Sequence, residues 1–374
     1  MKNENSVCFV AKIKEITPIP GADNIELAVI EGWNSIVKKG AHSIGELVIV
    51  ATTDAIIPEK IAEDLGIANY LRSGNRVRTV KLRGVYSECL IITPKGVYDK
   101  KLNEGDDLMD VLKVFKYEPP VKQVQLSRGG RKIRYQDNPN FQIYYKFPNM
   151  KNVPDIFNEK DEVQITRKIH GTNARFGLVK KVKLSFWDKT KKFLGIADDL
   201  IEYDFVVGSH NVEKGSDSQG FYDTNVWHDI AKKYDIQKHL KAYVKAMGKE
   251  YIGQGIIVYG EIYGAGIQKN YDYGMKDIDL VCFDIVINGE YVPMYYVRYM
   301  LDKFNLQHVP ILYEGFWSKE IQDSFVFNNF VANSKIPHEG VVIKALNGLR
   351  EKTAKVINPD YLIYSEKHDV SDSH

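Results

Sequence analysis

The sequence lacks the features of a membrane protein and of a secreted protein held by disulfides. No stretch approaches the roughly 18 consecutive apolar residues that indicate a membrane helix. The first five residues, 1–5, are mostly polar or charged, so we expect no secretory leader. The 374 residues include three cysteines, Cys8, Cys89 and Cys282, and their apolar surroundings and unpaired spacing predict buried, reduced thiols. These absences favour an intracellular, cytoplasmic protein.

An excess of one charge is also missing. The chain has 51 Lys and Arg against 49 Asp and Glu, a net charge of +2. A nucleic-acid surface would therefore have to come from local clusters of basic residues rather than from bulk charge. No internal repeat or low-complexity tract is visible, and a hydrophobic content of 44% is that of an ordinary globular protein. The length is sufficient for two domains.

Short apolar runs separated by Gly and Pro predict a small β-barrel in the first domain, residues 1–125. The runs occupy residues 7–16, 25–30, 34–37, 45–51, 77–82 and 89–92. The phrases P-x-P-x-A-D-N-I-E-L and L-R-G-V-Y-S-E-C-L resemble the OB-type tRNA-binding modules attached to some tRNA synthetases. RNA binding by an OB-type barrel is one expectation, and a barrel without RNA contacts is the alternative.

Basic and aromatic residues are mixed between Lys122 and Phe147, where we place the boundary to a second domain, residues 126–374. Such a mixture suits RNA phosphates and stacked bases. A Gly-Gly linker with solvated charges explains the first half of the stretch equally well. The residues concerned are Arg128, Arg131, Lys132, Arg134 and Lys146, with Tyr135, Phe141, Tyr144, Tyr145 and Phe147.

The second domain is predicted to be α+β, with antiparallel sheets flanked by helices. Strand-like runs cover residues 205–208, 256–262, 280–287 and 340–344. Helical periodicity covers residues 221–249 and is interrupted at Asp235. In its second half Leu240, Tyr243 and Met247 share one face, which we expect to pack against the sheets.

The first candidate for chemistry is Lys168, which ends the apolar alternation of residues 163–167 and precedes Gly171 by three positions. A strand would bring this lysine to its end, and the glycine would turn the chain tightly behind it. A lysine amine is a nucleophile when burial or nearby positive charge keeps part of it unprotonated. A solvated strand end is the ordinary alternative. Downstream apolar runs also contain single charged or aromatic residues, namely Glu261, Phe283, Glu339, Lys344 and Lys355.

In this order, K-x-H-G-T-N, G-E-x-x-G, F-D-I, E-G-V-V-I-K and a late lysine resemble the covalent nucleotidyltransferase superfamily of DNA ligases, RNA ligases and mRNA capping enzymes. The K-x-H-G-T-N form with a long N-terminal extension is most similar to RNA ligases of the Deinococcus and Naegleria type. The resemblance spans about residues 140 to 365. It implies an ATP-dependent ligase that seals 3′-OH and 5′-phosphate RNA ends, including those of nicked duplexes, through a lysyl-AMP intermediate. We expect such an enzyme to be a monomer.

The resemblance also implies roles for the residues of the site. Lys168 would be the nucleophile, and Glu261 and Glu339 would hold Mg²⁺ or Mn²⁺ directly or through water. Lys355 and Lys344 would neutralise charge on the α-phosphate of ATP.

Three further residues are expected to contact the nucleotide. Phe283 would stack on adenine, and Asn173 and His210 would contact the ribose or the phosphates. From the residues alone, Phe283 could be a core side chain and His210 a surface histidine, just as Lys344 could be a charge that ends a strand.

Two departures from the superfamily pattern narrow the interpretation. His170 replaces the acid of the common K-x-D-G motif and Asn173 lies near the usual place of an arginine, which points away from DNA ligases and capping enzymes. Thr353 stands where the first lysine of a K-x-K motif is often found. Lys352 could replace that lysine, but one step along a strand reverses the direction of the side chain. A DNA ligase, a capping guanylyltransferase and a non-catalytic RNA-binding protein are kept as alternatives.

Overall fold

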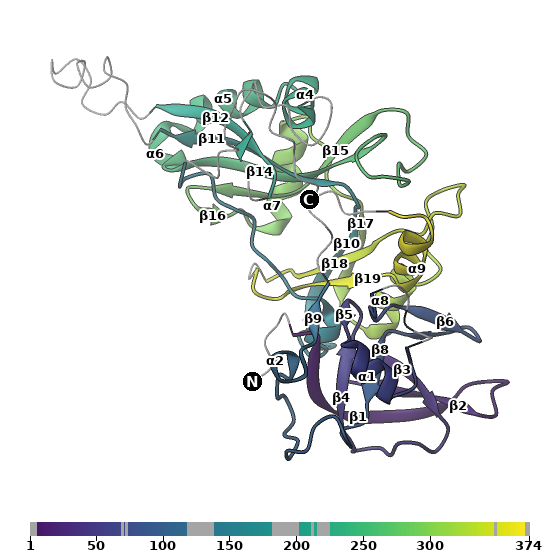
Figure 1. Cartoon of the computed structure of the whole chain (residues 1–374). Coiled ribbons are helices and arrows are strands. Elements are labelled where there is room, and N and C mark those ends of the chain that lie inside the picture. Colours follow the sequence, from purple (N-terminus) through teal and green to yellow (C-terminus); the bar gives the residue numbers. More distant parts are fainter. Residues whose placement is uncertain are drawn as a thin grey trace, which may run out of the picture.

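The computed structural model describes residues 6–68, 71, 74–117, 138–181, 202–210, 213–214, 225–347 and 350–370. Within these ranges a barrel is followed by two further antiparallel sheets, of four and six strands (Figure 1). The strands of the barrel domain are β1 (Cys8–Pro18), β2 (Ile25–Ile30), β3 (Trp33–Lys38), β4 (Leu47–Thr52), β5 (Ala55–Ile56), β6 (Val80–Leu82), β7 (Val85–Ser87), β8 (Cys89–Ile92) and β9 (Phe115–Lys116). Its helices are α1 (Glu59–Asp64) and α2 (Met109–Leu112).

The second domain contains both strands and helices. Its strands are β10 (Glu162–Lys168), β11 (Thr172–Lys180), β12 (Tyr203–Gly208), β13 (Glu213–Lys214), β14 (Gly255–Gly264), β15 (Ile278–Ile287), β16 (Glu290–Tyr291), β17 (Ile311–Phe316), β18 (Gly340–Ala345) and β19 (Thr353–Ile357). Its helices are the 3₁₀ turn η1 (Met150–Asn152), α4 (Val226–Lys233), α5 (Ile236–Met247), α6 (Lys249–Ile252), α7 (Met294–Lys303), α8 (Lys319–Val326) and α9 (Pro359–Lys367). Across the described ranges, no helix is long and apolar enough to cross a membrane.

The barrel is a five-stranded sheet in the order β3-β2-β1-β4-β8 that closes on itself. The amide of Glu88 donates to the Asn34 carbonyl at 2.7 Å, which joins β3 to the segment before β8. Along β1, Phe9 and Ile13 point into the barrel core, while Val10 packs on the opposite side with residues of α1 and α2. The predicted barrel is confirmed. The expected strand at residues 77–82 is shorter, since its pairing begins only at Val80.

Two antiparallel sheets form the second domain and confirm the predicted α+β class. The six-stranded sheet has the order β13-β12-β11-β14-β15-β16, and α4, α5 and α7 cover one of its faces. The four-stranded sheet has the order β17-β10-β18-β19, and α8 packs on its outer face. Alternation along β11 explains the two-sided burial: residues 174, 176 and 178 join the helix-covered core, and residue 179 joins a second core on the other face.

The helical stretch 221–249 is divided as the sequence predicts, and Leu240 and Tyr243 of the expected face pack on the core, but Met247 does not. Asp235 has a positive φ of 48° and separates α4 from α5, and residues 221–224 lie outside the described residues. The buried residues of α5 are Ile236, Leu240 and Val244, whereas Met247 is 44% exposed. The expectation for Met247 was wrong, because α5 ends there and Ile252 of α6 fills the next position of the core.

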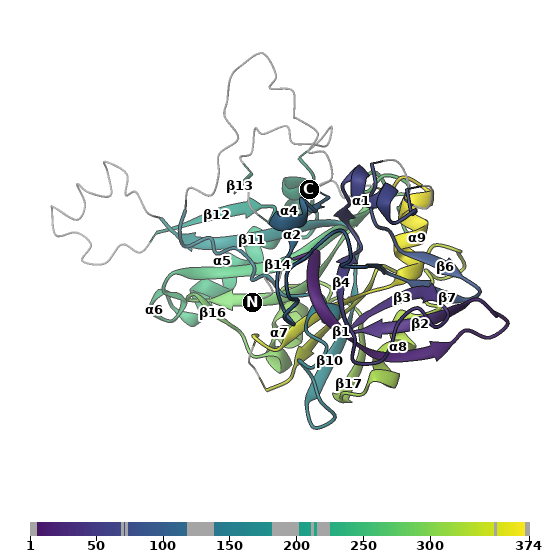
Figure 2. The same cartoon turned by 60° about the horizontal axis from the view of Figure 1, so that its bottom comes forward.

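The barrel is docked against the four-stranded sheet and α9 (Figure 2). Glu88, 3% exposed, forms an ion pair with Lys151 of η1, and Lys81 of β6 pairs with Asp360 of α9 at 3.3 Å. A Cβ atom on Gly32 would lie 2.6 Å from the Cα atom of Lys151, so only glycine allows this close approach. Further contacts join Arg78 to Glu366 and Tyr86 to Phe327. The predicted domain boundary near residue 125 lies outside the described residues.

The three cysteines are free and buried, as predicted. Burial raises the pKa of Cys8 and Cys89 to about 12 and also raises the pKa of Cys282. Because the thiolate is the reactive form, we expect none of the three thiols to react with Ellman's reagent at about pH 8 in the folded protein. All three should react after denaturation. A thiol that reacts within seconds in the native protein would contradict this burial.

Candidate active site

Lys168 is the last residue of β10, at the point where the four-stranded sheet ends. It is paired with Gly340, the first residue of β18, so it lies next to Glu339. The Lys168 Nζ atom is 2.6 Å from Glu339 Oε1, and the two side chains are 26% and 10% exposed. The strand therefore carries the lysine to its end, as the sequence predicts, and holds it there in a partly enclosed ion pair.

The register of the four-stranded sheet places three lysines on one face. Thr166 of β10 is paired with Val342, which is paired with Lys355, and one step further Gln164, Lys344 and Thr353 are paired in the same way. Directly paired residues project to the same side of a sheet, and so do residues two apart on one strand. Lys168, Lys355 and Lys344 therefore share the face that carries the candidate nucleophile.

The six-stranded sheet contributes the second carboxylate. Asn173 of β11 is paired with Glu261 of β14, and Glu261 is half-buried. Gly171 allows the turn after Lys168 to approach this strand. A Cβ atom on Gly171 would lie 2.2 Å from the Ile262 carbonyl oxygen and 3.0 Å from Glu261 Cγ. The glycine is thus required by close backbone packing, and the two glutamates lie on either side of the turn that follows the lysine.

His170 replaces the acid of the common motif with a buried, multiply contacted imidazole. The ring is 3% exposed, and the Tyr361 hydroxyl lies 3.1 Å from its Nδ1 atom. Glu339 Oε2 is 3.8 Å from the same nitrogen, and the His170 amide donates to the Tyr273 hydroxyl at 2.6 Å. These contacts anchor the turn after Lys168 to α9 and to the loop after β14.

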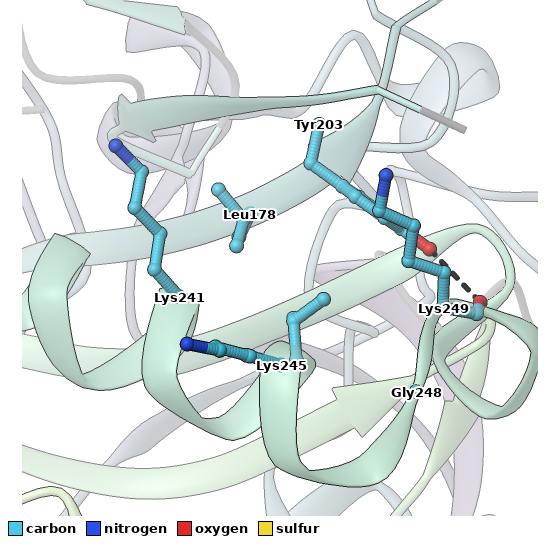
Figure 3. Close-up of a pocket in the computed structure, with 7 residues that line it drawn as sticks. Leu178, Tyr203, Lys241, Lys245, Gly248 and Lys249 are labelled. Atoms are coloured by element: carbon cyan, nitrogen blue, oxygen red, sulfur yellow. Dashed lines mark hydrogen bonds between the residues drawn. The ribbon is translucent and has the colours of Figure 1, made fainter. Parts of the chain in front are cut away.

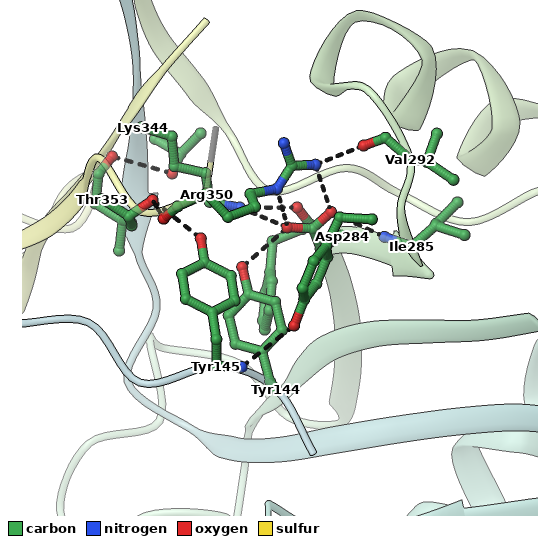
Figure 4. A network of polar contacts seen from close by, with 12 residues as sticks. Tyr144, Tyr145, Asp284, Ile285, Val292, Lys344, Arg350 and Thr353 are labelled. Atoms are coloured by element: carbon green, nitrogen blue, oxygen red, sulfur yellow. Dashed lines mark hydrogen bonds and ion pairs between the residues drawn. The ribbon is translucent and has the colours of Figure 1, made fainter. Parts of the chain in front are cut away.

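A buried carboxylate, Asp284 of β15, connects the two sheets (Figure 4). It accepts hydrogen bonds from Lys344 at 3.1 Å, from Arg350 at 3.0 and 3.1 Å, and from the Tyr144 hydroxyl at 3.0 Å. Burial opposes ionisation of Asp284, but the charges of Lys344 and Arg350 outweigh it and hold the pKa of the carboxyl below its ordinary value. Lys344 is therefore engaged with a protein carboxylate in the wall of the site.

The position of the missing lysine is occupied by the buried Thr353. Its hydroxyl lies 3.0 Å from the Tyr145 hydroxyl and donates to the Arg350 carbonyl at 2.8 Å. The Nζ atom of Lys352 pairs with Asp161 at 2.7 Å and its side chain is 36% exposed, so Lys352 does not project onto the face of Thr353. Arg350 was not predicted as a site residue; its signal in the sequence was a basic residue three positions before Thr353, in the turn between two strands.

Two predicted nucleotide contacts lie on or beside the six-stranded sheet. Phe283 is half-buried, and its ring centroid is 5.0 Å from that of Tyr144. It precedes Asp284 at an irregularity in the pairing of β14 with β15, which changes the register there. His210 follows β12, next to Ser209, whose carbonyl accepts a hydrogen bond from the fully buried Arg175 at 2.8 Å. The roles of Phe283 and His210 stay predictions.

The stretch proposed to bind RNA before β10 is partly core. Phe141 and Tyr144 are 0% and 6% exposed, so they cannot stack on bases, and this part of the prediction was wrong. Arg175, another residue that the sequence analysis missed, donates to the Phe141 and Gln142 carbonyls and fixes this segment against the sheet. The other half of the stretch, including Arg128, Arg131, Lys132, Arg134 and Tyr135, lies outside the described residues.

The carboxylates fit a hard divalent ion that keeps part of its water. Within the described part of the chain, no group of three His, Cys, Asp or Glu side chains gathers into a protein-only metal site. Glu339 Oε2 is buried and has no hydrogen-bond partner among the described residues, so one strong acceptor remains open beside Lys168. Mg²⁺ and Mn²⁺ accept such carboxylate oxygens and complete their shell with water and phosphate oxygens.

Comparison with known proteins agrees with this geometry. A family model for RNA ligases matches residues 161–357, which is more than half of the 374 residues, and the chain belongs to the RNA ligase family. A model for an OB-fold domain matches residues 7–94. A search of curated protein sequences gave no match.

Solved structures with a similar fold include the RNA ligase of Naegleria gruberi with PPi. It is 22% identical over 98% of this chain and 99% of that chain, with a TM-score of 0.68. A mutant of the same enzyme with ATP and Mn is 22% identical over 98% of this chain and 100% of that chain, with a TM-score of 0.70. The similarity therefore extends over both domains of the fold.

We predict that the Asp284 cluster contributes to the free energy of unfolding. Replacing Asp284 with Ala would leave Lys344 and Arg350 buried without their shared carboxylate. Removing one partner of a buried pair costs about 3–5 kcal/mol, and we expect a loss of this size in the free energy of unfolding measured with urea. Glu104→Ala is the control, because Glu104 is 50% exposed where it pairs with Lys12, and about 1 kcal/mol or less is expected. Similar losses in both variants would show that the cluster does not join the sheets.

Proposed function

We propose that the chain is an ATP-dependent RNA ligase that joins 3′-OH and 5′-phosphate RNA ends through a lysyl-AMP intermediate. The observation that carries the proposal is the Lys168 amine, 2.6 Å from Glu339, in a partly enclosed site of a chain that belongs to the RNA ligase family. Mutants of the Naegleria gruberi RNA ligase have been solved with ATP and Mn and with AMP and Mn, which supports ATP as the substrate.

In the first step the Lys168 nitrogen would attack the α-phosphorus of ATP. A P–N bond forms, the bond to the β-phosphate oxygen breaks, and pyrophosphate leaves. The amine must first lose one proton, since the ion pair with Glu339 holds it as an ammonium with no lone pair. Lys355, on the same face as Lys168, would neutralise the charge that builds on the α-phosphate.

In the second step an oxygen of the RNA 5′-phosphate would attack the phosphorus of the lysine-bound AMP, which releases Lys168 and leaves AMP on the RNA end. In the third step the RNA 3′-hydroxyl attacks the 5′-phosphate, a phosphodiester forms, and AMP leaves. Both steps depend on alignment of the two reacting groups and on charge neutralisation more than on acid–base chemistry. The half-buried Phe283 is proposed to hold the adenine, and Asn173 and His210 the ribose or phosphates.

Glu261 and Glu339 are proposed to hold the divalent metal. A bound Mg²⁺ or Mn²⁺ would neutralise phosphate charge and disfavour the ammonium form of a neighbouring lysine. In this proposal Glu339 has two roles, because its Oε1 atom orients Lys168 before ATP binds and its open Oε2 atom is available to the ion.

The two domains are proposed to divide the work, with the barrel of residues 1–125 holding RNA and residues 126–374 carrying the chemistry. The residues proposed for nucleotidyl transfer all follow residue 160, whereas the barrel domain contributes ion pairs to the interface. We further propose that the enzyme is monomeric and cytoplasmic, and that it acts on RNA ends, including those of nicked duplexes.

The first test is covalent labelling with radioactive ATP and a divalent metal. Lys168→Ala should abolish labelling because no other amine replaces the lost nucleophile, whereas Lys352→Ala, which loses an amine paired with Asp161, should label normally. Folding is checked by thermal unfolding of both variants. Labelling of Lys168→Ala would refute the assignment of the nucleophile, and preferential labelling by GTP would favour a capping enzyme.

A second test concerns the nucleic acid. We expect sealing of a nick with ribose at the 3′-OH side and much slower sealing when deoxyribose replaces it, since the 2′-hydroxyl is the group that distinguishes RNA from DNA. Sealing rates with pre-formed lysyl-AMP enzyme on matched nicked duplexes measure this directly. Equal rates on an all-DNA nick would indicate a DNA ligase.

A further inference from the structure

Helix α5 presents a stripe of lysines on its solvent side. Lys238, Lys241 and Lys245 are three and four residues apart, so they share one face, and Lys249 follows four residues later at the start of α6. All four are exposed, and α5 contains no carboxylate. Among the described residues, none of the four forms an ion pair. Like charges at this spacing repel each other, so the stripe would be stabilised by an anionic partner.

The stripe borders a pocket of about 360 Å³. Leu178 of β11 and Val244 of α5 are its apolar lining residues. Lys241, Lys245 and Lys249 also line it (Figure 3). Tyr203 lines the same pocket, and its hydroxyl donates to the Gly253 carbonyl at 3.0 Å. The pocket therefore combines apolar lining residues with several positive charges.

Exposed tyrosines continue this surface onto α7. Tyr295 and Tyr299 are 81% and 50% exposed, and Tyr296 and Tyr299 stack with their ring centroids 5.1 Å apart. Lys303 lies 5.3 Å from the centroid of the Tyr299 ring. Together with the 55% exposed Tyr251 of α6, these rings form a tyrosine patch, which we define as Tyr251, Tyr295, Tyr296 and Tyr299.

Tyr243 of α5 connects the lysine stripe to the tyrosine patch. Its ring meets Phe304 edge-on at 5.4 Å, and burial together with the nearby hydroxyls of Tyr251 and Tyr296 raises its pKa to about 12.

The charges of this surface are mostly positive. Helices α5, α6 and α7 contain six Lys or Arg residues against two carboxylates, Glu250 and Asp302.

We propose that the lysine stripe and the tyrosine patch form an accessory binding surface for single-stranded RNA, with phosphates on the lysines and bases stacked on the tyrosines. Basic groups beside exposed aromatic rings are the combination that single-stranded nucleic acids require. The choice of RNA rests on the proposed function. A protein partner would instead have to neutralise the lysine stripe with carboxylates. Measurements of RNA binding by variants of the stripe distinguish RNA from a protein as the partner.

This surface is separate from the site of nucleotidyl transfer. Leu178 faces the helix-covered core, whereas Asn173 and Glu261 belong to the alternate positions of β11 and β14. Leu178 is five residues beyond Asn173, about 17 Å along the strand. RNA bound to the lysine stripe and the tyrosine patch would lie beyond the two ends that are joined. The surface would therefore contribute to binding only for RNA long enough to reach it.

The test is the salt dependence of binding to a labelled single-stranded RNA with a 5′-hydroxyl, which cannot be adenylylated. Lys241→Gln with Lys245→Gln should lower the slope of log affinity against log salt by about 1.4, because each lost phosphate contact changes it by about 0.7. Lys160→Gln with Lys319→Gln removes two exposed charges elsewhere and should leave the slope unchanged. Equal slopes for the two double variants would overturn the proposal.

Stacking is tested separately at Tyr299. Tyr299→Ala should weaken RNA binding about tenfold, and Tyr299→Phe, which keeps the ring, should bind as the parent protein does. Labelling by ATP should be unchanged in all these variants. If the parent protein is not labelled by ATP, the proposed function is refuted. If RNA binding is unchanged in both Tyr299→Ala and the Lys241/Lys245 variant, the accessory surface is refuted.

Discussion

The arrangement of the site depends on one buried carboxylate. Asp284 belongs to the six-stranded sheet, and its partners Lys344 and Arg350 come from β18 and from the turn after it, in the four-stranded sheet. Charges with exposed fractions of 0% and 6% would be costly if they were unpaired, so the two sheets are stable only when these groups meet. The turn after Lys168 then packs against Glu261, since a Cβ atom on Gly171 would lie 3.0 Å from Glu261 Cγ. The arrangement of the candidate site is thus a consequence of how the sheets are joined.

In the proposed mechanism, the Lys168–Glu339 ion pair would keep the nucleophile aligned and inactive before ATP binds. The pair holds the amine at the end of its strand, and at the same time it favours the protonated form. In the proposed mechanism, activation would require Glu339 to be drawn toward another cation. The buried His170 gives the turn a second attachment through Tyr361, so the turn keeps its position when the ion pair changes.

The positions of several candidate site residues could be predicted from the local periodicity of the sequence. Lys168 and Lys355 lie on strands of seven and five residues whose alternation is visible in the sequence, and their common face follows from the register. Glu339 directly precedes a third such strand, β18. The roles of Arg350 and Arg175 could not be predicted, because each depends on a partner far away in the sequence, Asp284 and the Phe141 carbonyl. Phe141 and Tyr144 were misjudged for the same reason, since composition does not reveal which side of a segment is covered.

Helix α9 connects the barrel to the segment that carries Lys168, the proposed nucleophile. Asp360 faces the barrel, where it pairs with Lys81, and the next residue, Tyr361, faces the site and contacts His170. A helix moves as a rigid unit, so a displacement of the barrel that shifts Asp360 also shifts Tyr361. The Asn358 side chain caps this helix and donates to the His338 carbonyl, next to Glu339. RNA bound across the barrel would therefore act on both ends of the Lys168–Glu339 pair through one short helix. An accessory domain can in this way be mechanically continuous with a site to which it contributes no proposed catalytic residue.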